Sequence, residues 1–412
     1  MNSCTDNSRL NGLSFKELRE QYRSGLFEDF LPFMDKYVID REYGGFMCHA
    51  DRDGTRVSTA KRAWFEGRGI WVYSFLHNKF GRDPKHLDVA RKSVEFILKN
   101  KPEGDNFWPG SFTREGKPLE DPNPPFYGRT SIYGDLFIAT GFAEYSKSDG
   151  NGHYWDIARG ILLKCMNIYD NRPGHCSLPP TDSAPGVDSP RILGHWMVFL
   201  RLATEMLESK ADPAVEKIAG RCVKAIMDHH FNPEYGLLNE YINHDMSRIN
   251  SDYGEISTGH GTEVLWMILD EALRIKNREL FDLAAARLKR HIEVFWDDVY
   301  GGLMVELVHA NRNTWNTQKW LWLQEEALIG VMMVIEHTGV QWAKDWYARI
   351  SVYMRDKFLL KQYGLLLWIF NAGRKVTFER NSDRIENFHL PRYLMLNLLA
   401  IERIINKKEW RN

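Results

Sequence analysis

Two short stretches of the chain carry histidines in settings that suit proton transfer. Residues 259–266 read GHGTEVLW, where His260 and Glu263 are three residues apart and so share one face of a helix. Near the other end, FHLPR places His389 just before Pro391 and Arg392, where a helix is expected to start. An imidazole titrates near neutral pH and works as acid or base, so both histidines are candidate acid–base groups.

The pair His260 and Glu263 is also compatible with a metal site or a simple helix cap. A metal site needs a third ligand and a matching motif, such as HExxH or paired Glu-x-x-His, and the sequence has neither. The Gly-x-Ser-x-Gly elbow, the P-loop and the Gly-x-Gly-x-x-Gly motif are absent as well. We therefore predict no metal, and chemistry that requires no cofactor.

Other polar or aromatic residues interrupt apolar helical patterns. Arg68, in KRAWFEGRGIWVYSFL, either pairs with Glu66 or another acid, or lies in a pocket where a fixed cation stabilises developing negative charge. His195 interrupts the apolar helix RILGHWMVFLRL, and a histidine in such a helix is more often a core residue than a ligand. In QKWLWLQEEALIG, the simplest interpretation of Trp322 and Glu326 is a packing tryptophan and an exposed charge.

A Tyr-Gly turn recurs along the chain and indicates how these residues are positioned. Four stretches, beginning at Tyr43, Tyr235, Tyr300 and Tyr363, read Tyr-Gly followed by an apolar residue or by Gly and an apolar residue. Neighbouring stretches are about one period of roughly 64 residues apart, except the first two, which are about three periods apart. About six such periods fit the chain. Degenerate copies fall at residues 106–116 and 171–180. The glycines permit a tight turn, and the flanking apolar pieces are expected to pair as small hairpins.

Between these turns, apolar residues spaced three and four apart predict two helices per period. The expected helices span residues 14–38, 60–79, 86–100, 129–146, 153–169, 190–209, 212–230, 256–275, 279–296, 317–338, 340–357 and 391–406. An open solenoid has uniform repeats and polar end caps, whereas these repeats have diverged and the last helical stretch is apolar. We therefore predict an all-α fold, an (α/α)6 toroid in a single domain over residues 1–412, with short β-hairpin loops and a pocket at one rim.

Composition narrows the class of ligand. The 54 basic and 55 acidic residues give a net charge of −1, so no overall field favours nucleic acid or an anionic membrane. No apolar run approaches the roughly 20 residues that span a bilayer. The five cysteines are scattered without a CxxC pair, as reduced thiols are. We expect a soluble cytoplasmic protein with a small-molecule ligand, and the 13% of aromatic residues fits a sugar.

These stretches, in this order, resemble the N-acylglucosamine 2-epimerase family, which includes cellobiose 2-epimerases and aldose-ketose isomerases that act on mannose. GHGTEVLW resembles its Gly-His-x-x-Glu signature, FHLPR its terminal His-x-Pro-Arg motif, and WFEGRGIW its arginine motif. WDDVYGGL and QKWLWLQEEAL resemble two of its later blocks. The resemblance covers nearly the whole chain, and five motifs in register are far more specific than any one of them. It implies the same (α/α)6 barrel.

The resemblance also implies an activity and a set of roles. The protein would be a sugar 2-epimerase that interconverts N-acyl-D-glucosamine and N-acyl-D-mannosamine, or acts on a related aldose. His260 and His389 would move a proton at carbon 2 through an enediolate. Arg68 would lie near the carbonyl oxygen, and Glu263 would support His260.

Further residues follow from the resemblance as a substrate-binding set. Trp322 and Glu326 would surround the sugar, and His195 matches a pocket histidine of the mannose-isomerase and cellobiose branches. Dimer formation and stimulation by a nucleotide occur in the family, and no motif in this sequence supports the nucleotide.

Two departures from the family pattern bear on the substrate. Ser257 and Thr258 stand where Asn-Pro is frequent, and Arg384 and Ile385 stand where a Trp-Lys pair is common. We expect both to alter pocket walls rather than the proton-transfer pair. The alternatives are mannose–fructose isomerisation, glycoside hydrolysis by paired carboxylates on the same toroid, and a non-catalytic sugar- or protein-binding member.

Overall fold

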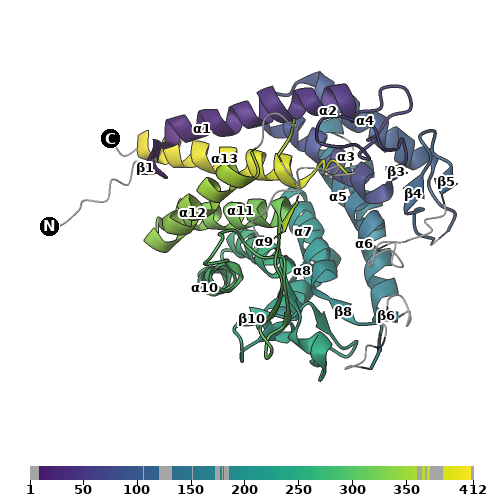
Figure 1. Cartoon of the computed structure of the whole chain (residues 1–412). Coiled ribbons are helices and arrows are strands. Elements are labelled where there is room, and N and C mark those ends of the chain that lie inside the picture. Colours follow the sequence, from purple (N-terminus) through teal and green to yellow (C-terminus); the bar gives the residue numbers. More distant parts are fainter. Residues whose placement is uncertain are drawn as a thin grey trace.

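The computed structural model describes residues 9–104, 106–119, 132–150, 152–171, 177–178, 180, 185–359, 364–366, 369–371 and 384–409. In these ranges the chain alternates between helices of an inner ring and helices of an outer ring (Figure 1). The inner helices are α3 (Ala63–Lys79), α5 (Ile132–Asp149), α7 (Leu193–Ser209), α9 (His260–Arg274), α11 (Leu321–Thr338) and α13 (His389–Glu409).

Each inner helix packs against an outer one. The outer helices are α1 (Phe15–Ser24), which continues through a π-helical segment η1 (Gly25–Phe30) into α2 (Leu31–Tyr37), then α4 (Pro84–Lys99), α6 (His153–Asn171), α8 (Pro213–Lys224) with η2 (Ala225–His229), α10 (Arg278–Phe295) and α12 (Gln341–Lys357). These twelve helical rods of the described chain agree with the twelve predicted helices. The start predicted at residue 129 lies outside the described residues.

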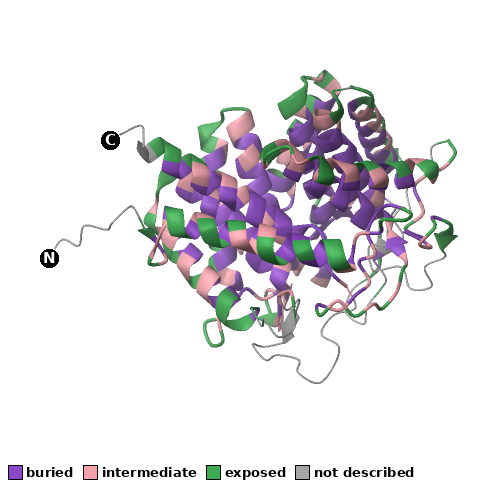
Figure 2. Cartoon of the chain, turned by 90° about the horizontal axis from the view of Figure 1, so that it is seen from above, coloured by how far each residue is buried: buried purple, intermediate pink, exposed green. Residues whose placement is uncertain are grey.

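Contacts between the inner helices close the ring. They touch in the order α3, α5, α7, α9, α11 and α13, and α13 returns to α3, while α1 packs along α13. The inner helices are buried around most of their circumference, and the outer helices expose one face (Figure 2). The predicted (α/α)6 toroid is therefore confirmed. None of the described helices combines the length and apolar composition that crossing a membrane requires.

Loops of very different length lie at the two rims. Connections from an inner helix to the next outer helix are short, whereas those from an outer to an inner helix carry the Tyr-Gly turns and the strands. All pairings are antiparallel: β1 (Arg9–Leu10) with β2 (Leu13–Ser14), β3 (Lys61–Arg62) with β4 (Ser111–Phe112) and β4 with β5 (Pro118–Leu119), β6 (Ser177–Leu178) with β7 (Val187–Asp188), β8 (Arg191–Ile192) with β11 (Tyr241–Ile242), β9 (Phe231–Asn232) with β10 (Leu237–Leu238), β12 (Ser257–Thr258) with β13 (Glu306–His309) and β13 with β14 (Thr314–Asn316), and β15 (Gln318–Trp320) with β16 (Ile369–Asn371). All six inner helices consequently begin at the long-loop rim.

The Tyr-Gly turns form the expected small hairpins. Gly236 has a φ of 70° in the turn between β9 and β10, and the pairs Gly44–Gly45 and Gly301–Gly302 have φ values of 75–85°. Antiparallel bridges Ile39–Phe46 and Trp296–Leu303 close the two double-glycine turns. Residues 106–116 contribute β4 to a hairpin, while Tyr363 and most of residues 171–180 lie outside the described residues.

Capping differs between the rings. Ser14, Asp83, Asp212 and Asn277 cap the outer helices α1, α4, α8 and α10 with their side chains. In the described structure, α3, α7, α9 and α11 begin without a side-chain cap. The first turns of α7, α9 and α11 carry the candidate residues His195, His260 and Trp322, and the positive ends of the helix dipoles face the long-loop rim.

Candidate active site

The two histidines occupy equivalent positions in the ring. His260 is the first residue of α9, and His389 is the first residue of α13. The last helix therefore begins two residues earlier than predicted, because Pro391 falls in its first turn, where a proline needs no hydrogen-bond donor. Both imidazoles contact the indole of Trp322, the second residue of α11, with ring centroids 5.8 Å and 5.6 Å apart. The two rings therefore border the same space.

Glu240 holds one of these imidazoles. His260 Nδ1 lies 3.0 Å from Glu240 Oε1, and the Thr258 hydroxyl donates to Glu240 Oε2 at 2.6 Å. Glu240 has no solvent exposure, whereas the side chain of His260 is 18% exposed. The link from β10 to β11, which supplies Glu240, precedes His260 by 20 residues and shows no motif, so sequence reasoning missed it.

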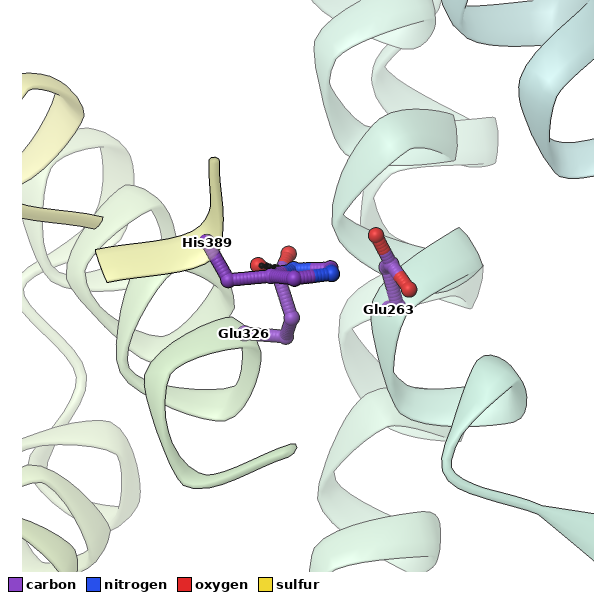
Figure 3. Close-up of side chains that lie close together, drawn as sticks. All are labelled: Glu263, Glu326 and His389. Atoms are coloured by element: carbon purple, nitrogen blue, oxygen red, sulfur yellow. Dashed lines mark hydrogen bonds and ion pairs between the residues drawn. The ribbon is translucent and has the colours of Figure 1, made fainter. Parts of the chain in front are cut away.

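A buried ionic cluster holds the other imidazole. His389 Nδ1 lies 3.0 Å from Glu326 Oε1 and 3.1 Å from Arg392 Nη2. Arg392 pairs with both Glu326, at 2.7 Å, and Glu263. Figure 3 shows His389, Glu326 and Glu263 directed towards one another from three inner helices. Glu326 also accepts from Trp266 Nε1 at 2.7 Å.

This arrangement adds to the expected role of Glu263 and corrects one interpretation of Glu326. Glu263 raises the pKa of His260 through its charge, and its carboxylate also pairs with Arg392 of α13. Glu326 is not the exposed charge that the sequence suggested, because it is fully buried and contacts His389 and Arg392. Both glutamates therefore contribute to the support of His389.

The two histidines have opposite electrostatic settings. Burial disfavours the imidazolium of His260, but the charge of Glu240 and its hydrogen bond outweigh burial and raise the pKa of His260. Burial lowers the pKa of His389 to about 3, since the charges of Glu386 and Glu263 offset it only in part. At neutral pH, His389 is therefore uncharged, and His260 holds a second proton more readily than His389 does.

Arg68 lies on α3 between aromatic rings. Its guanidinium carbon is 4.1 Å from the Phe137 ring centroid and 4.9 Å from that of Phe388. Nη1 donates to Glu386 Oε1 at 2.7 Å, so Arg68 pairs with an acid, although that acid is not Glu66. Arg384 pairs with the other oxygen of Glu386, and the cations lower the pKa of Glu386 to about 2 despite its burial.

His195 lies in the site's wall and is fully buried. Its ring stacks at a tilt on Tyr133 of α5, with centroids 4.6 Å apart, and meets the edge of Tyr169. A Cβ added to Gly194 would lie 2.3 Å from the Tyr133 hydroxyl and 2.9 Å from His260 Cε1. Tyr133 therefore approaches the same point as His260, and no motif singled it out in the sequence.

The two departures from the family pattern affect the partners of His260 and Arg68 as well as the pocket walls. Thr258 bonds the carboxylate that holds His260, and Arg384 shares Glu386 with Arg68. The expectation that these positions leave the proton-transfer pair untouched is wrong for Thr258, because its side chain is one hydrogen bond away from the carboxylate on His260 Nδ1.

Glu263, Glu326 and His389 have the residue types and spacing of a metal site, with candidate ligand atoms within 4.8 Å of one another. Arg392 Nη2 contacts all three residues, so a guanidinium already supplies positive charge where a metal ion would. The same cation pairs both carboxylates, which is unsuitable for the free acid and base of a glycosidase.

Comparison with known proteins gives concordant matches. The sequence profile of N-acylglucosamine 2-epimerase (GlcNAc 2-epimerase) matches residues 44–390. The N-acylglucosamine 2-epimerase of Bos taurus is 23% identical over 378 residues, which cover 87% of this chain and 85% of that protein. The solved cellobiose 2-epimerase of Spirochaeta thermophila superposes with a TM-score of 0.78 at 16% identity, covering 95% of this chain and 98% of that one. A D-mannose isomerase structure gives a TM-score of 0.72 at 14% identity, covering 97% and 100% of the two chains.

Proposed function

We propose a reaction from the premise that this chain belongs to the N-acylglucosamine 2-epimerase family and is therefore an isomerase that acts on carbohydrates. The reaction is epimerisation at carbon 2 of an aldose, with His260 and His389 as the two proton-transfer groups. The proposal rests on two imidazoles, one in the first turn of α9 and one in the first turn of α13. Both contact the Trp322 ring, and a buried carboxylate lies at hydrogen-bond distance from Nδ1 of each.

The two steps follow from the asymmetry of the histidines. In the open-chain sugar, neutral His389 removes the carbon 2 proton through Nε2, in the tautomer whose Nδ1–H donates to Glu326 and not in the one whose Nδ1 accepts from Arg392. The electrons of the C2–H bond form a C1–C2 double bond, and the carbonyl electrons move to O1, which gives an enediolate. Protonated His260 then delivers a proton to the opposite face of carbon 2, and the electrons return to restore the carbonyl. The reverse direction exchanges the two roles.

Positive charge at the rim favours the enediolate. Arg68 is a fixed cation, held flat by Phe137 and Phe388, that can face O1 as negative charge develops. One such preorganised donor is typically worth about 3–4 kcal/mol. The uncapped starts of α9 and α11 add the positive ends of their dipoles.

The substrate that we propose is an N-acyl-D-glucosamine, interconverted with its N-acyl-D-mannosamine epimer. The support is the likeness to the bovine N-acylglucosamine 2-epimerase over 87% of the chain. Product analysis separates this reaction from mannose–fructose isomerisation, since the isomerase returns the proton to carbon 1 and yields a ketose. A ketose without any 2-epimer would contradict epimerisation.

The proposal is tested by incubating the enzyme with N-acetylglucosamine in heavy water and following deuterium at carbon 2 by NMR. We expect exchange in the wild type and a loss of exchange of about 10²–10⁴-fold in His389→Ala, which lacks the base for this substrate. Formation of the 2-epimer should fall by a similar factor in both His260→Ala and His389→Ala. His153→Ala is the matched control, because His153 is the exposed first residue of an outer helix, α6. Undiminished exchange in His389→Ala, or undiminished 2-epimer in either active-site variant, with folding intact by circular dichroism, would refute the two-histidine scheme.

A further inference from the structure

Glu240 is fixed in the fold by its backbone as well as its side chain. It lies in the link between β10 and β11 and is fully buried. Its carbonyl accepts from Leu193 N, the first residue of α7, at 2.9 Å, and its amide donates to Ile256 O at 2.7 Å, just before β12. Its backbone is therefore held by the start of α7 and by the segment that leads into α9.

Thr258 completes a closed set of hydrogen bonds around His260. Its hydroxyl donates to Glu240 Oε2 at 2.6 Å and accepts from the backbone N–H of His260 at 3.3 Å. Glu240 Oε1 accepts from His260 Nδ1 at 3.0 Å. One hydroxyl thus orients the carboxylate, which in turn fixes the plane and tautomer of the imidazole.

We propose that Thr258 and Glu240 are the positioning residues of His260, with a division of labour between them. Glu240 supplies the negative charge that keeps the imidazole protonated, and Thr258 holds the carboxylate so that Oε1 stays on Nδ1. The Nε2 atom then points consistently at carbon 2. This inference rests on the proposed function, in which His260 donates the second proton.

Several other charged or titratable residues lie near His260, Glu240 and Thr258, and Glu240 is the acid bonded to His260 Nδ1. Glu263 and Arg68 act on His260 with opposite signs. Around Glu240, burial together with the Glu240 charge raises the pKa of Glu306 on β13, and burial lowers that of His230 to about 4. Other titratable neighbours are Tyr133 of α5 and His195, which follows Gly194 on α7. His291 of α10 lies beside Gly261 of α9, and burial lowers the pKa of His291 to about 3.

Two substitutions separate charge from position. In Glu240→Gln, the amide can still bond both Nδ1 and the Thr258 hydroxyl, but the charge is gone. The high-pH limb of kcat/KM, set by the raised pKa of His260, should then move to lower pH by about one unit or more. In Thr258→Val, the charge remains but the carboxylate loses its orienting donor. We expect kcat to fall about tenfold, with KM and the high-pH limb nearly unchanged.

Matched controls make the test decisive. Thr258→Ser keeps the hydroxyl and should restore kcat. Thr262→Val makes the same change on α9 at a buried hydroxyl that has no hydrogen-bond partner in the described structure, and should leave kcat unaltered. Wild-type kcat in Thr258→Val, equal loss in Thr258→Ser, or an unmoved limb in Glu240→Gln would each overturn the inference. If the wild type itself exchanges no carbon 2 proton, the proposed function fails instead.

Discussion

At the scale of residues, the site depends on cations that are held before the substrate arrives. Arg68 is fixed by Glu386 and by two aromatic faces, so it does not have to reorganise when the enediolate forms. Arg68→Met keeps an unbranched apolar side chain and removes the guanidinium with its charge. We expect kcat to fall by about 10²–10³-fold with a smaller change in KM, because the lost interaction belongs mainly to the transition state. Steady-state kinetics test this, with Arg91→Met on the exposed face of α4 as the control.

Residue types were predictable from the sequence, and their partners were not. His260, His389 and Arg68 stand out because each interrupts an apolar helix near its start, and the structure brings all three to one rim. Glu240 meets His260 only through folding, and Glu263 meets Arg392 across 129 positions of sequence. No local pattern reports such pairings, since they depend on how inner helices are rotated in the closed ring.

At the scale of elements, the same kind of hydrogen bond joins the preceding loop to an inner helix in three repeats. The fourth residues of α3, α5 and α11 are Glu66, Asp135 and Gln324, and each accepts a backbone N–H from the turn before its helix, at 2.9–3.0 Å. The period of about 64 residues predicted the repeats. The side chains that accept these hydrogen bonds differ from repeat to repeat, so they could not be recognised in the sequence. In α9 and α13 the fourth residues are Glu263 and Arg392, which pair with each other within the site.

Buried aspartate–lysine pairs support the double-glycine turns, and they give a stability prediction. Lys61 lies 3.0 Å from Asp40, and Lys61 is fully buried. Asp40→Asn leaves that ammonium without its counter-ion and should lower the free energy of unfolding by about 3 kcal/mol near neutral pH. The exposed pair of Arg41 and Asp35 is the control, since Asp35→Asn should cost less than about 1 kcal/mol. Denaturant unfolding monitored by circular dichroism compares the two.

The same pair fixes how this stabilisation depends on pH. Burial opposes ionisation of Asp40, but Arg114 and Lys61 lower its pKa to about 2. An unfolded aspartate titrates near 3.9, so the contribution is present in full above about pH 4 and is lost as the pH falls towards 2. The difference in stability between wild type and Asp40→Asn should therefore shrink over that interval. A difference that stays constant down to pH 2 would contradict the assignment.

At the scale of the whole molecule, the candidate site lies at the rim where the inner helices begin, away from the start of α1 and the end of α13. Helix α1 packs along α13, and both meet at the end of the molecule where α1 begins and α13 finishes (Figure 1). Helix α13 also begins with His389 and is the inner helix that returns to α3. The last helix therefore both completes the ring and carries one histidine of the proposed proton-transfer pair.

This layout predicts which circular permutants remain active. The native ends would be joined by a flexible Gly/Ser linker and the chain opened elsewhere. New ends at Lys276, in the short loop between α9 and α10, leave every inner-helix start intact, so kcat should stay within a few-fold of wild type. New ends at Val299, a residue that is 80% exposed, cut the turn before Trp322 that is hydrogen-bonded to Lys319 and Gln324. Both openings are at exposed turns, yet only the second should abolish carbon 2 exchange while near-native helicity remains. Equal loss in both permutants would mean that the two rims are not independent.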